Sequence, residues 1–219
     1  MHLAKRWQIR IFFLIWFGIL AVFSKQPFGF LLLNTFLAYI PIEIGFHLHQ
    51  RTVNASILYW PILFLWIVFY PNAPYILTDL FHLSLLSPYD QTTGLLRLST
   101  PMWIDYLLLT ISALVSAFVG AWSLSETIKS LMNKLHCKSK FIYGLLVLLM
   151  TFTASVGVFI GRFLRLHTIY LLLSPRLFIM PLVRMWTPDM LIFTGVMTIL
   201  QLVIYWLIII NQRPKIETK

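Results

Sequence analysis

Four side chains that could do chemistry lie in one stretch of an otherwise apolar chain, PNAPYILTDLFHLSLLSPYD at residues 71–90. They are Asn72, Tyr75, Asp79 and His82, separated by three, four and three residues. On an α-helix this spacing places all four on one face. Asp79 and His82 could then act as a catalytic acid or base, while Asn72 and Tyr75 orient a ligand. The structural alternative is that Asp79 neutralises an arginine and His82 lies among lipid headgroups.

The same carboxylate and imidazole could supply two ligands to a metal ion. A third ligand is not close in the sequence, where the nearest candidates are Asp90 and His167, so we predict no metal site. Motifs for nucleotide, dinucleotide or haem binding do not occur, and we expect no cofactor. The single cysteine, Cys137, excludes an internal disulfide.

A second candidate group is the arginine pair in GRFLRLH, residues 161–167. Arg162 and Arg165 share a helix face and could clamp a phosphate, a pyrophosphate or a carboxylate. The alternative is that they extend toward lipid headgroups or form structural ion pairs. Asp105 lies about one turn inside an apolar span, where an unpaired charge is costly, and Arg162 is expected at the matching depth. We therefore also predict a structural ion pair between Asp105 and Arg162.

The elements that position these residues follow from composition. With 59% hydrophobic residues, 11% charged residues and a mean hydropathy of +0.84, the 219-residue chain has more apolar surface than a water-soluble core can bury. We predict an all-α, polytopic membrane helical bundle that forms a single transmembrane domain, residues 1–219. The six predicted spans are at about 11–23, 28–46, 55–70, 102–123, 141–161 and 189–210.

Two further segments are predicted not to span. The stretch 73–87, capped by Asn72 and stopped by Ser87 and Pro88, is predicted to form a short outer-face or re-entrant helix. Residues 168–186 are interrupted by prolines and arginines and are expected at the interface or as a re-entrant segment. The last span opens with Thr187-Pro188-Asp189, in which Thr187 is expected to cap the helix.

Small residues recur every four positions on two consecutive spans. They are Ser112, Ser116 and Gly120 on the fourth span, and Thr153, Gly157 and Gly161 on the fifth. Because small side chains let helix backbones approach closely, we predict that these two spans pack against each other. In the second span, Glu43 and His47 are four residues apart and face the same way, for which an interfacial role is expected.

Charge gives the orientation. The net charge is +10, but the basic residues are scattered between apolar runs and form no basic domain, so we expect no nucleic-acid partner. Eleven of the seventeen lysines and arginines fall on the side of the amino terminus, which predicts that both termini are cytoplasmic. The 71–90 stretch then lies at the outer face.

The segments PNAPYILTDLFHL and GVFIGRFLRLH resemble a bacterial family of multi-pass membrane proteins, domain of unknown function family 1361. The resemblance covers nearly the whole chain and departs at His167, Thr168 and Ile169. It implies a bacterial cell-membrane setting and brings no assigned activity.

Two functions remain open from the residues. The first is a non-catalytic membrane component, such as a scaffold, an accessory subunit or a small transporter, with membrane lipids and a membrane protein as its partners. The alternative is an enzyme or binding protein acting on a phosphorylated or lipid-linked anionic substrate at the outer leaflet, with Asp79 and His82 at its centre.

Overall fold

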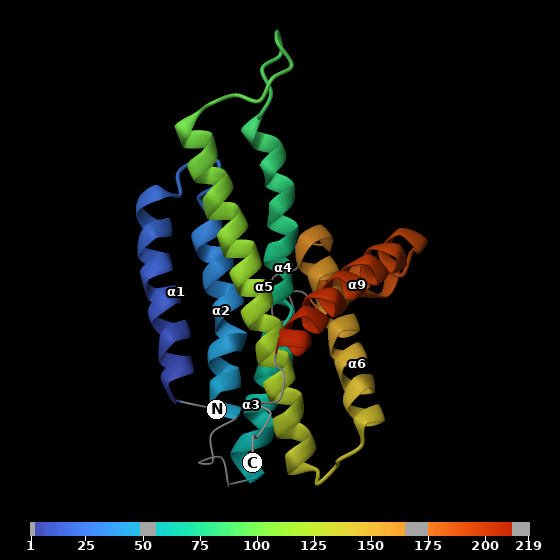
Figure 1. The fold of residues 1–219 in the computed structure, drawn as a ribbon. Helices are drawn as coiled ribbons and strands as arrows, with labels where there is room; N and C mark the ends of the chain where they lie inside the picture. The colour runs from blue at the N-terminus through green and yellow to red at the C-terminus, as the bar shows by residue number, and fades with distance from the viewer. Residues whose placement is uncertain (1–2, 49–55, 165–174, 212–219) are drawn as a thin grey trace. The chain divides into compact units, whose positions relative to one another are not determined.

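A computed structural model describes residues 3–48, 56–164 and 175–211 of the chain (Figure 1). The described residues form helices joined by turns, and none of them belongs to a strand, which confirms the predicted all-α bundle. Within these described ranges, six segments are long and apolar enough to cross a membrane, so this is a multi-pass membrane protein. Those segments are Lys5–Phe23, Phe30–Leu48, Ile57–Leu86, Thr100–Lys134, Lys140–Leu164 and Pro188–Ile210.

The described residues divide into two compact units, Met1–Gly120 and Ala121–Lys219. One continuous helix, α5 (Thr100–Lys134), belongs to both units. The predicted single domain over residues 1–219 therefore stays a prediction.

In the first unit, α2 (Phe30–Leu48) is the central helix. It packs against α1 (Leu3–Phe23), which reaches it through the turn 24–29, and against α3 (Ser56–Phe69), α4 (Asn72–Tyr75) and η1 (Ile76–Leu86). In Figure 1, α3, α4 and η1 follow one another along one path beside α2. The end of this unit that carries the turn 24–29 and residues 88–97 is called the hairpin end below.

The short helix predicted over 73–87 is observed as the second half of a longer helical segment. Backbone hydrogen bonds continue across the proline at the junction, from Ala73 N–H to the Tyr70 oxygen at 3.0 Å and from Tyr75 N–H to the Pro71 oxygen at 3.0 Å. Pro71 lacks only an N–H and keeps helical dihedrals, φ −54° and ψ −24°. The helix therefore continues where the sequence suggested a new beginning.

The predicted cap at Asn72 is wrong for the same reason. No side chain caps this helix, since the preceding residues are already helical. The Asn72 amide instead donates to the backbone oxygen of Phe69 at 2.9 Å. The predicted stop is confirmed, because η1 ends at Leu86 and Ser87 adopts left-handed dihedrals with φ 44° before Pro88.

A small hairpin, residues 88–97, connects η1 to α5. Asp90 N–H donates to the Leu95 oxygen at 2.9 Å, and Arg97 N–H donates to the Pro88 oxygen at 2.8 Å. At the tip, the Asp90 carboxylate accepts hydrogen bonds from the backbone of Thr92 at 2.8 Å and of Thr93 at 3.0 Å. These bonds give the connection a fixed shape despite its polar sequence.

The small residues of α5 pack on partners other than the predicted one. Ser112 accepts a hydrogen bond from the indole N–H of Trp16 in α1 at 2.9 Å. A Cβ atom added at Gly120 would lie 2.6 Å from the Cβ atom of Ala73 in α4. These two positions serve contacts within the first unit, and the predicted packing of the fourth span on the fifth stays a prediction.

The second unit contains the end of α5, α6 (Lys140–Phe159), the π-helical turn η2 (Ile160–Leu164), α8 (Pro175–Arg184) and α9 (Pro188–Asn211). Helices α6 and α9 pack against each other. The predicted cap of α9 is confirmed, because the Thr187 hydroxyl accepts a hydrogen bond from Met190 N–H at 3.3 Å. Residues 168–174 lie outside the described part, and α8, with ten residues, is too short to span alone.

Candidate functional site

The Asp79 side chain lies at the hairpin end and is almost completely buried, with 1% of its surface exposed. Its Oδ2 accepts a hydrogen bond from the Nδ2 of Asn34, one turn inside α2, at 2.8 Å. A buried carboxylate needs hydrogen-bond donors in place of the water that it has lost. This contact therefore both supports the carboxylate and joins η1 to α2.

His82 lies directly beyond Asp79 on η1. Successive residues of a 3₁₀-helix turn by about 120°, so positions three apart are eclipsed. The His82 Nδ1 is 3.0 Å from the backbone oxygen of Asp79 and 4.0 Å from its Oδ1. The imidazole ring packs against Phe30, with ring centroids 4.4 Å apart, and 30% of the side chain remains exposed.

The other two predicted residues are placed differently. The 3₁₀ geometry turns Asp79 about 120° away from Tyr75, where an α-helix would turn it only about 40°. The Asn72 amide is already bound to the Phe69 oxygen. The structure thus brings Asp79 and His82 together and adds Asn34, whereas the winding of η1 turns Tyr75 away from Asp79 and the Asn72 amide NH₂ group binds the Phe69 oxygen.

The two residues of the predicted ion pair, Asp105 and Arg162, belong to different units, and the predicted arginine clamp includes a residue outside the described part. Arg162 lies in η2 of the second unit, whereas Arg165 and His167 lie outside the described residues. Asp105 is half-buried in the first unit, where it makes no hydrogen bond or ion pair to another residue within 3–48 or 56–120. The Asp105–Arg162 pair and the role of Arg165 stay predictions.

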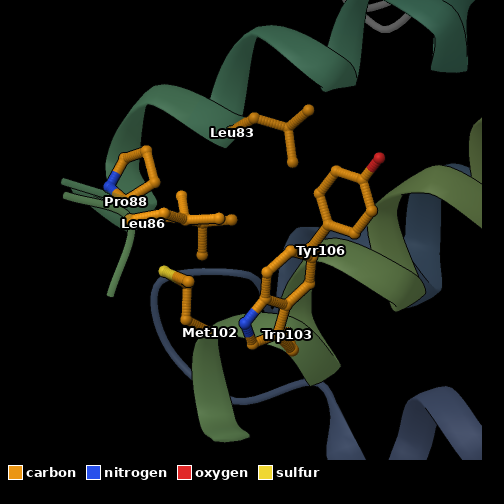
Figure 2. A pocket seen from close by; sticks show the side chains of 7 residues that line it. Leu83, Leu86, Pro88, Met102, Trp103 and Tyr106 are labelled. Carbon is orange, nitrogen blue, oxygen red and sulfur yellow. The ribbon is translucent and has the colours of Figure 1, made fainter. Parts of the chain in front are cut away.

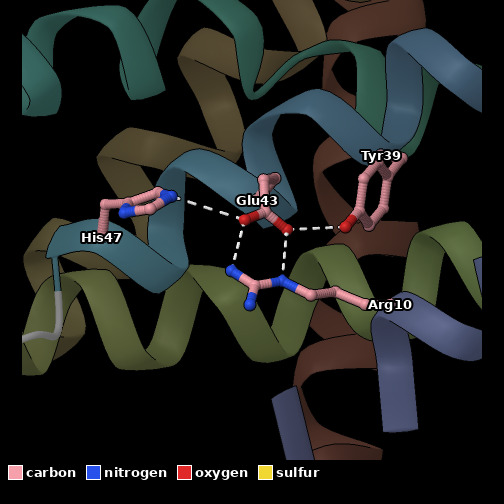
Figure 3. Close-up of polar contacts among 4 residues, drawn as sticks. All are labelled: Arg10, Tyr39, Glu43 and His47. Carbon is pink, nitrogen blue, oxygen red and sulfur yellow. Dashed lines mark hydrogen bonds and ion pairs between the residues drawn. The ribbon is translucent and has the colours of Figure 1, made fainter. Parts of the chain in front are cut away.

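A second polar cluster, which the sequence did not reveal as such, joins α1 to α2 (Figure 3). Arg10 forms a two-point ion pair with Glu43, in which Nε contacts Oε2 at 3.0 Å and Nη2 contacts Oε1. The Tyr39 hydroxyl donates to Glu43 Oε2 at 2.6 Å, and His47 Nε2 lies 3.4 Å from Oε1. Both carboxylate oxygens of Glu43 are therefore occupied.

The signal for this pair was present in the numbering. Arg10 precedes the turn 24–29 by the same number of residues by which Glu43 follows it. In two antiparallel helices of equal rise, such residues lie at the same level. Read one at a time, Arg10 is one of the basic residues that predict topology and Glu43 is expected at the interface, so neither residue alone predicts the pair.

A third polar group is buried between α6 and α9. The Gln201 Nε2 donates to Ser155 Oγ at 2.8 Å, and the Thr198 hydroxyl donates to the same oxygen at 3.0 Å. Ser155 itself donates to the Thr151 backbone oxygen at 2.9 Å. In a membrane the hydrophobic effect contributes little to helix association, so hydrogen bonds of this kind help to hold two helices together.

Among the residues that the structure describes, no group of three or more histidine, cysteine or acidic side chains is placed to hold a metal ion. The arrangement around Asp79 offers instead a buried carboxylate, a supporting amide and a partly exposed imidazole. Its chemistry is that of a polar helix junction or of a single acid–base pair.

The comparisons with known proteins identify a family but no activity. The model of the family described as "Protein of unknown function (DUF1361)" matches residues 33–204. No curated protein matches the chain, and no solved structure does.

Proposed function

Since the chain belongs to the family of proteins of unknown function DUF1361, whose description carries no activity, we propose from its own geometry that it is a non-catalytic membrane component, a scaffold or accessory subunit. The observation that carries this proposal is the burial of the Asp79 carboxylate against Asn34. A carboxylate with 1% of its surface exposed serves helix packing better than it serves an arriving substrate.

Both polar junctions of the first unit involve α2, one near each end. At the hairpin end Asn34 binds Asp79 of η1, and toward the other end Glu43 binds Arg10 of α1. Polar contacts of this kind fix the register of helices in a membrane, where apolar contacts with lipid and with protein are nearly equivalent. The first unit would thus offer partners a rigid surface.

A residue exchange tests the proposal. Asn34→Asp and Asp79→Asn, each alone, should lower the thermal unfolding temperature of the purified protein in detergent, because each leaves a mismatched buried pair, costing about 1–3 kcal/mol. The double variant restores an amide facing a carboxylate and should recover most of the loss. Ser84→Ala, on the exposed side of η1, is the matched control. Equal stability of all variants would contradict the proposal.

The second candidate function is an enzyme or binding protein for a phosphorylated or lipid-linked substrate at the outer leaflet of a bacterial cell membrane. The partly exposed His82 ring, directly above Asp79, is the observation that favours it. This function requires that Asp79→Asn abolish ligand binding while the protein stays folded, and that the exchange with Asn34 fail to restore binding. Arg162 and Arg165 would hold the anionic group.

A further inference from the structure

A pocket of about 250 Å³ lies between the end of η1 and the beginning of α5 (Figure 2). Figure 2 shows the side chains around it, which are Leu83 and Leu86 from η1, Pro88 from the hairpin, and Met102, Trp103 and Tyr106 from α5. The polar atoms of these side chains are limited to the Trp103 indole N–H and the Tyr106 hydroxyl. The pocket is smaller than the 300–1,000 Å³ typical of sites for drug-sized ligands, and it suits part of a hydrocarbon chain.

The level of the pocket follows from contacts between helices. His82 lies beside Phe30, the first residue of α2, so Leu83 and Leu86 lie beyond the start of α2. Trp16 of α1 lies beside Ser112 of α5. Toward the hairpin end, α1 continues for seven residues beyond Trp16, about 10 Å, whereas α5 extends twelve residues beyond Ser112, about 18 Å. By this measure α5 rises about 8 Å above α1 at the hairpin end.

This level corresponds to the headgroup layer of a membrane. The span in α1 and helix α2 have 19 residues each, about 28 Å, which matches a hydrocarbon core of about 30 Å. Their ends at the hairpin end therefore mark the hydrocarbon boundary, and the pocket lies at or just beyond it. Trp103 and Tyr106 are of the residue types that concentrate there. An apolar pocket in this polar layer needs an apolar occupant.

Exposed apolar side chains lead from the spans to the pocket. On η1, Phe81 precedes the pocket residues and Leu85 lies between Leu83 and Leu86. On α5, Leu107 follows Tyr106. All three side chains, Phe81, Leu85 and Leu107, are exposed. A chain lying along the protein in the bilayer would thus meet apolar side chains on both helices next to the pocket.

Two exposed cations, Lys25 and Arg97, belong to the two turns whose other residues contact or line the pocket walls, and neither forms an ion pair with any residue that the structure describes. Arg97 binds the pocket residue Pro88 through its backbone N–H. Lys25 belongs to the turn whose Phe28 packs in the same core cluster as Leu83 and Leu86. Asp105 precedes the pocket residue Tyr106, and its carboxylate would repel an anion. A phosphate would therefore lie near Lys25 and Arg97 and away from Asp105.

We propose that this pocket binds one acyl chain of an anionic phospholipid, whose phosphate lies between Lys25 and Arg97. The chain fills the space between η1 and α5, and the two cations select the headgroup charge. The proposal does not depend on the role of Asp79, because no pocket residue takes part in the Asn34–Asp79 contact.

The probe is phosphatidylglycerol with a photoreactive diazirine near the end of one acyl chain, added to the full-length protein in detergent micelles. Photolabelling followed by peptide mass spectrometry should place the label on residues 102–106. Met102→Trp fills the pocket and should reduce this labelling about tenfold, whereas Leu114→Trp, at an exposed position about three turns farther along the same helix, should not. Leu86→Trp fills the pocket from the opposite wall and replaces Met102→Trp if that variant fails to fold.

Headgroup selection is read with a matched phosphatidylcholine probe. The wild-type protein should be labelled several-fold more by phosphatidylglycerol, and Arg97→Gln combined with Lys25→Gln should remove this preference while labelling by phosphatidylcholine persists. Labelling that is equal in the wild-type protein and in the folded pocket-filling variants would show ordinary boundary lipid and overturn the proposal. Equal labelling of the wild-type protein by the two probes would overturn it as well.

Discussion

The guanidinium of Arg10 binds both carboxylate oxygens of Glu43 across the interface of α1 and α2. The planar fork of arginine matches a carboxylate in a way that the ammonium group of lysine cannot. This pair and the Tyr39 hydroxyl together saturate Glu43, a carboxylate within a membrane span.

We expect Arg10→Lys to destabilise the first unit nearly as much as Arg10→Gln, because only one of the two contacts can be remade. The expected loss is about 1–2 kcal/mol, measured as a lower unfolding temperature of the purified protein in detergent. Lys5→Gln, which removes an exposed cation from the same helix, should leave the temperature unchanged. A loss for Lys5→Gln equal to that for Arg10→Gln would point to net charge in place of the pair.

Gly120→Ala should destabilise the protein, because its Cβ atom would lie 2.6 Å from the Ala73 Cβ atom. The expected cost is about 1–3 kcal/mol for overpacking. Ala73→Gly in the same chain removes the clash and should restore most of the unfolding temperature. Gly144→Ala, where an added Cβ meets nothing within 4 Å, is the control. No recovery in the double variant would contradict this contact.

The hairpin should lose its tip in acid. Hydrogen bonds from the Thr92 hydroxyl and from the backbone N–H groups of Thr93 and Thr92 lower the pKa of Asp90 from 3.8 to about 2. Because the pKa is lower in the folded hairpin, the carboxylate stabilises it fully above about pH 4, and this contribution is lost as the pH falls through about 2.

Hydrogen exchange of the Thr92 and Thr93 amides, followed from pH 5 to pH 2 and corrected for intrinsic rates, measures this loss. Asp90→Asn should show reduced protection that no longer changes over this range. An unchanged protection in the wild-type protein at pH 2 would contradict the predicted role of the carboxylate.

The orientation can be read from the single cysteine. Cys137 lies between α5 and α6, on the side predicted to be cytoplasmic, and its side chain is partly exposed. A membrane-impermeant maleimide should label the wild-type protein only after cells are permeabilised. Cys137→Ser combined with Ser87→Cys moves the thiol to the hairpin end and should allow labelling in intact cells. The reverse pattern would overturn the predicted orientation.

Local signals in the sequence predicted local structure. Ser87 with Pro88 marked the end of η1, and Thr187 marked the start of α9, because each residue acts through its own backbone neighbourhood. The cap predicted at Asn72 was wrong, because the helix continues through Pro71, and a proline that loses one hydrogen bond inside a membrane does not have to end a helix. The residue types therefore located the spans better than the breaks between them.

The partners of the candidate residues were harder to predict. An arginine was one of the alternatives for the partner of Asp79, and nothing in the sequence pointed to Asn34, 45 residues earlier, whose amide binds it. The sequence between Asn34 and Asp79 has no regular repeat from which their contact could be predicted. In addition, the 3₁₀ geometry of η1 changed which side chains share a face. The pair of Arg10 and Glu43, by contrast, could have been found from its symmetric position about one short turn.

The 3₁₀ winding of η1 links length to rotation. Its eleven residues rise about 2.0 Å each, so the segment is about 5 Å longer than an α-helix of the same sequence. Rewinding it as an α-helix would draw the hairpin toward α2 by nearly one helical turn. It would also rotate His82 relative to Asp79 by about 60°. Within η1, shortening along the helix axis and rotation of His82 away from Asp79 would thus occur together, as one screw motion.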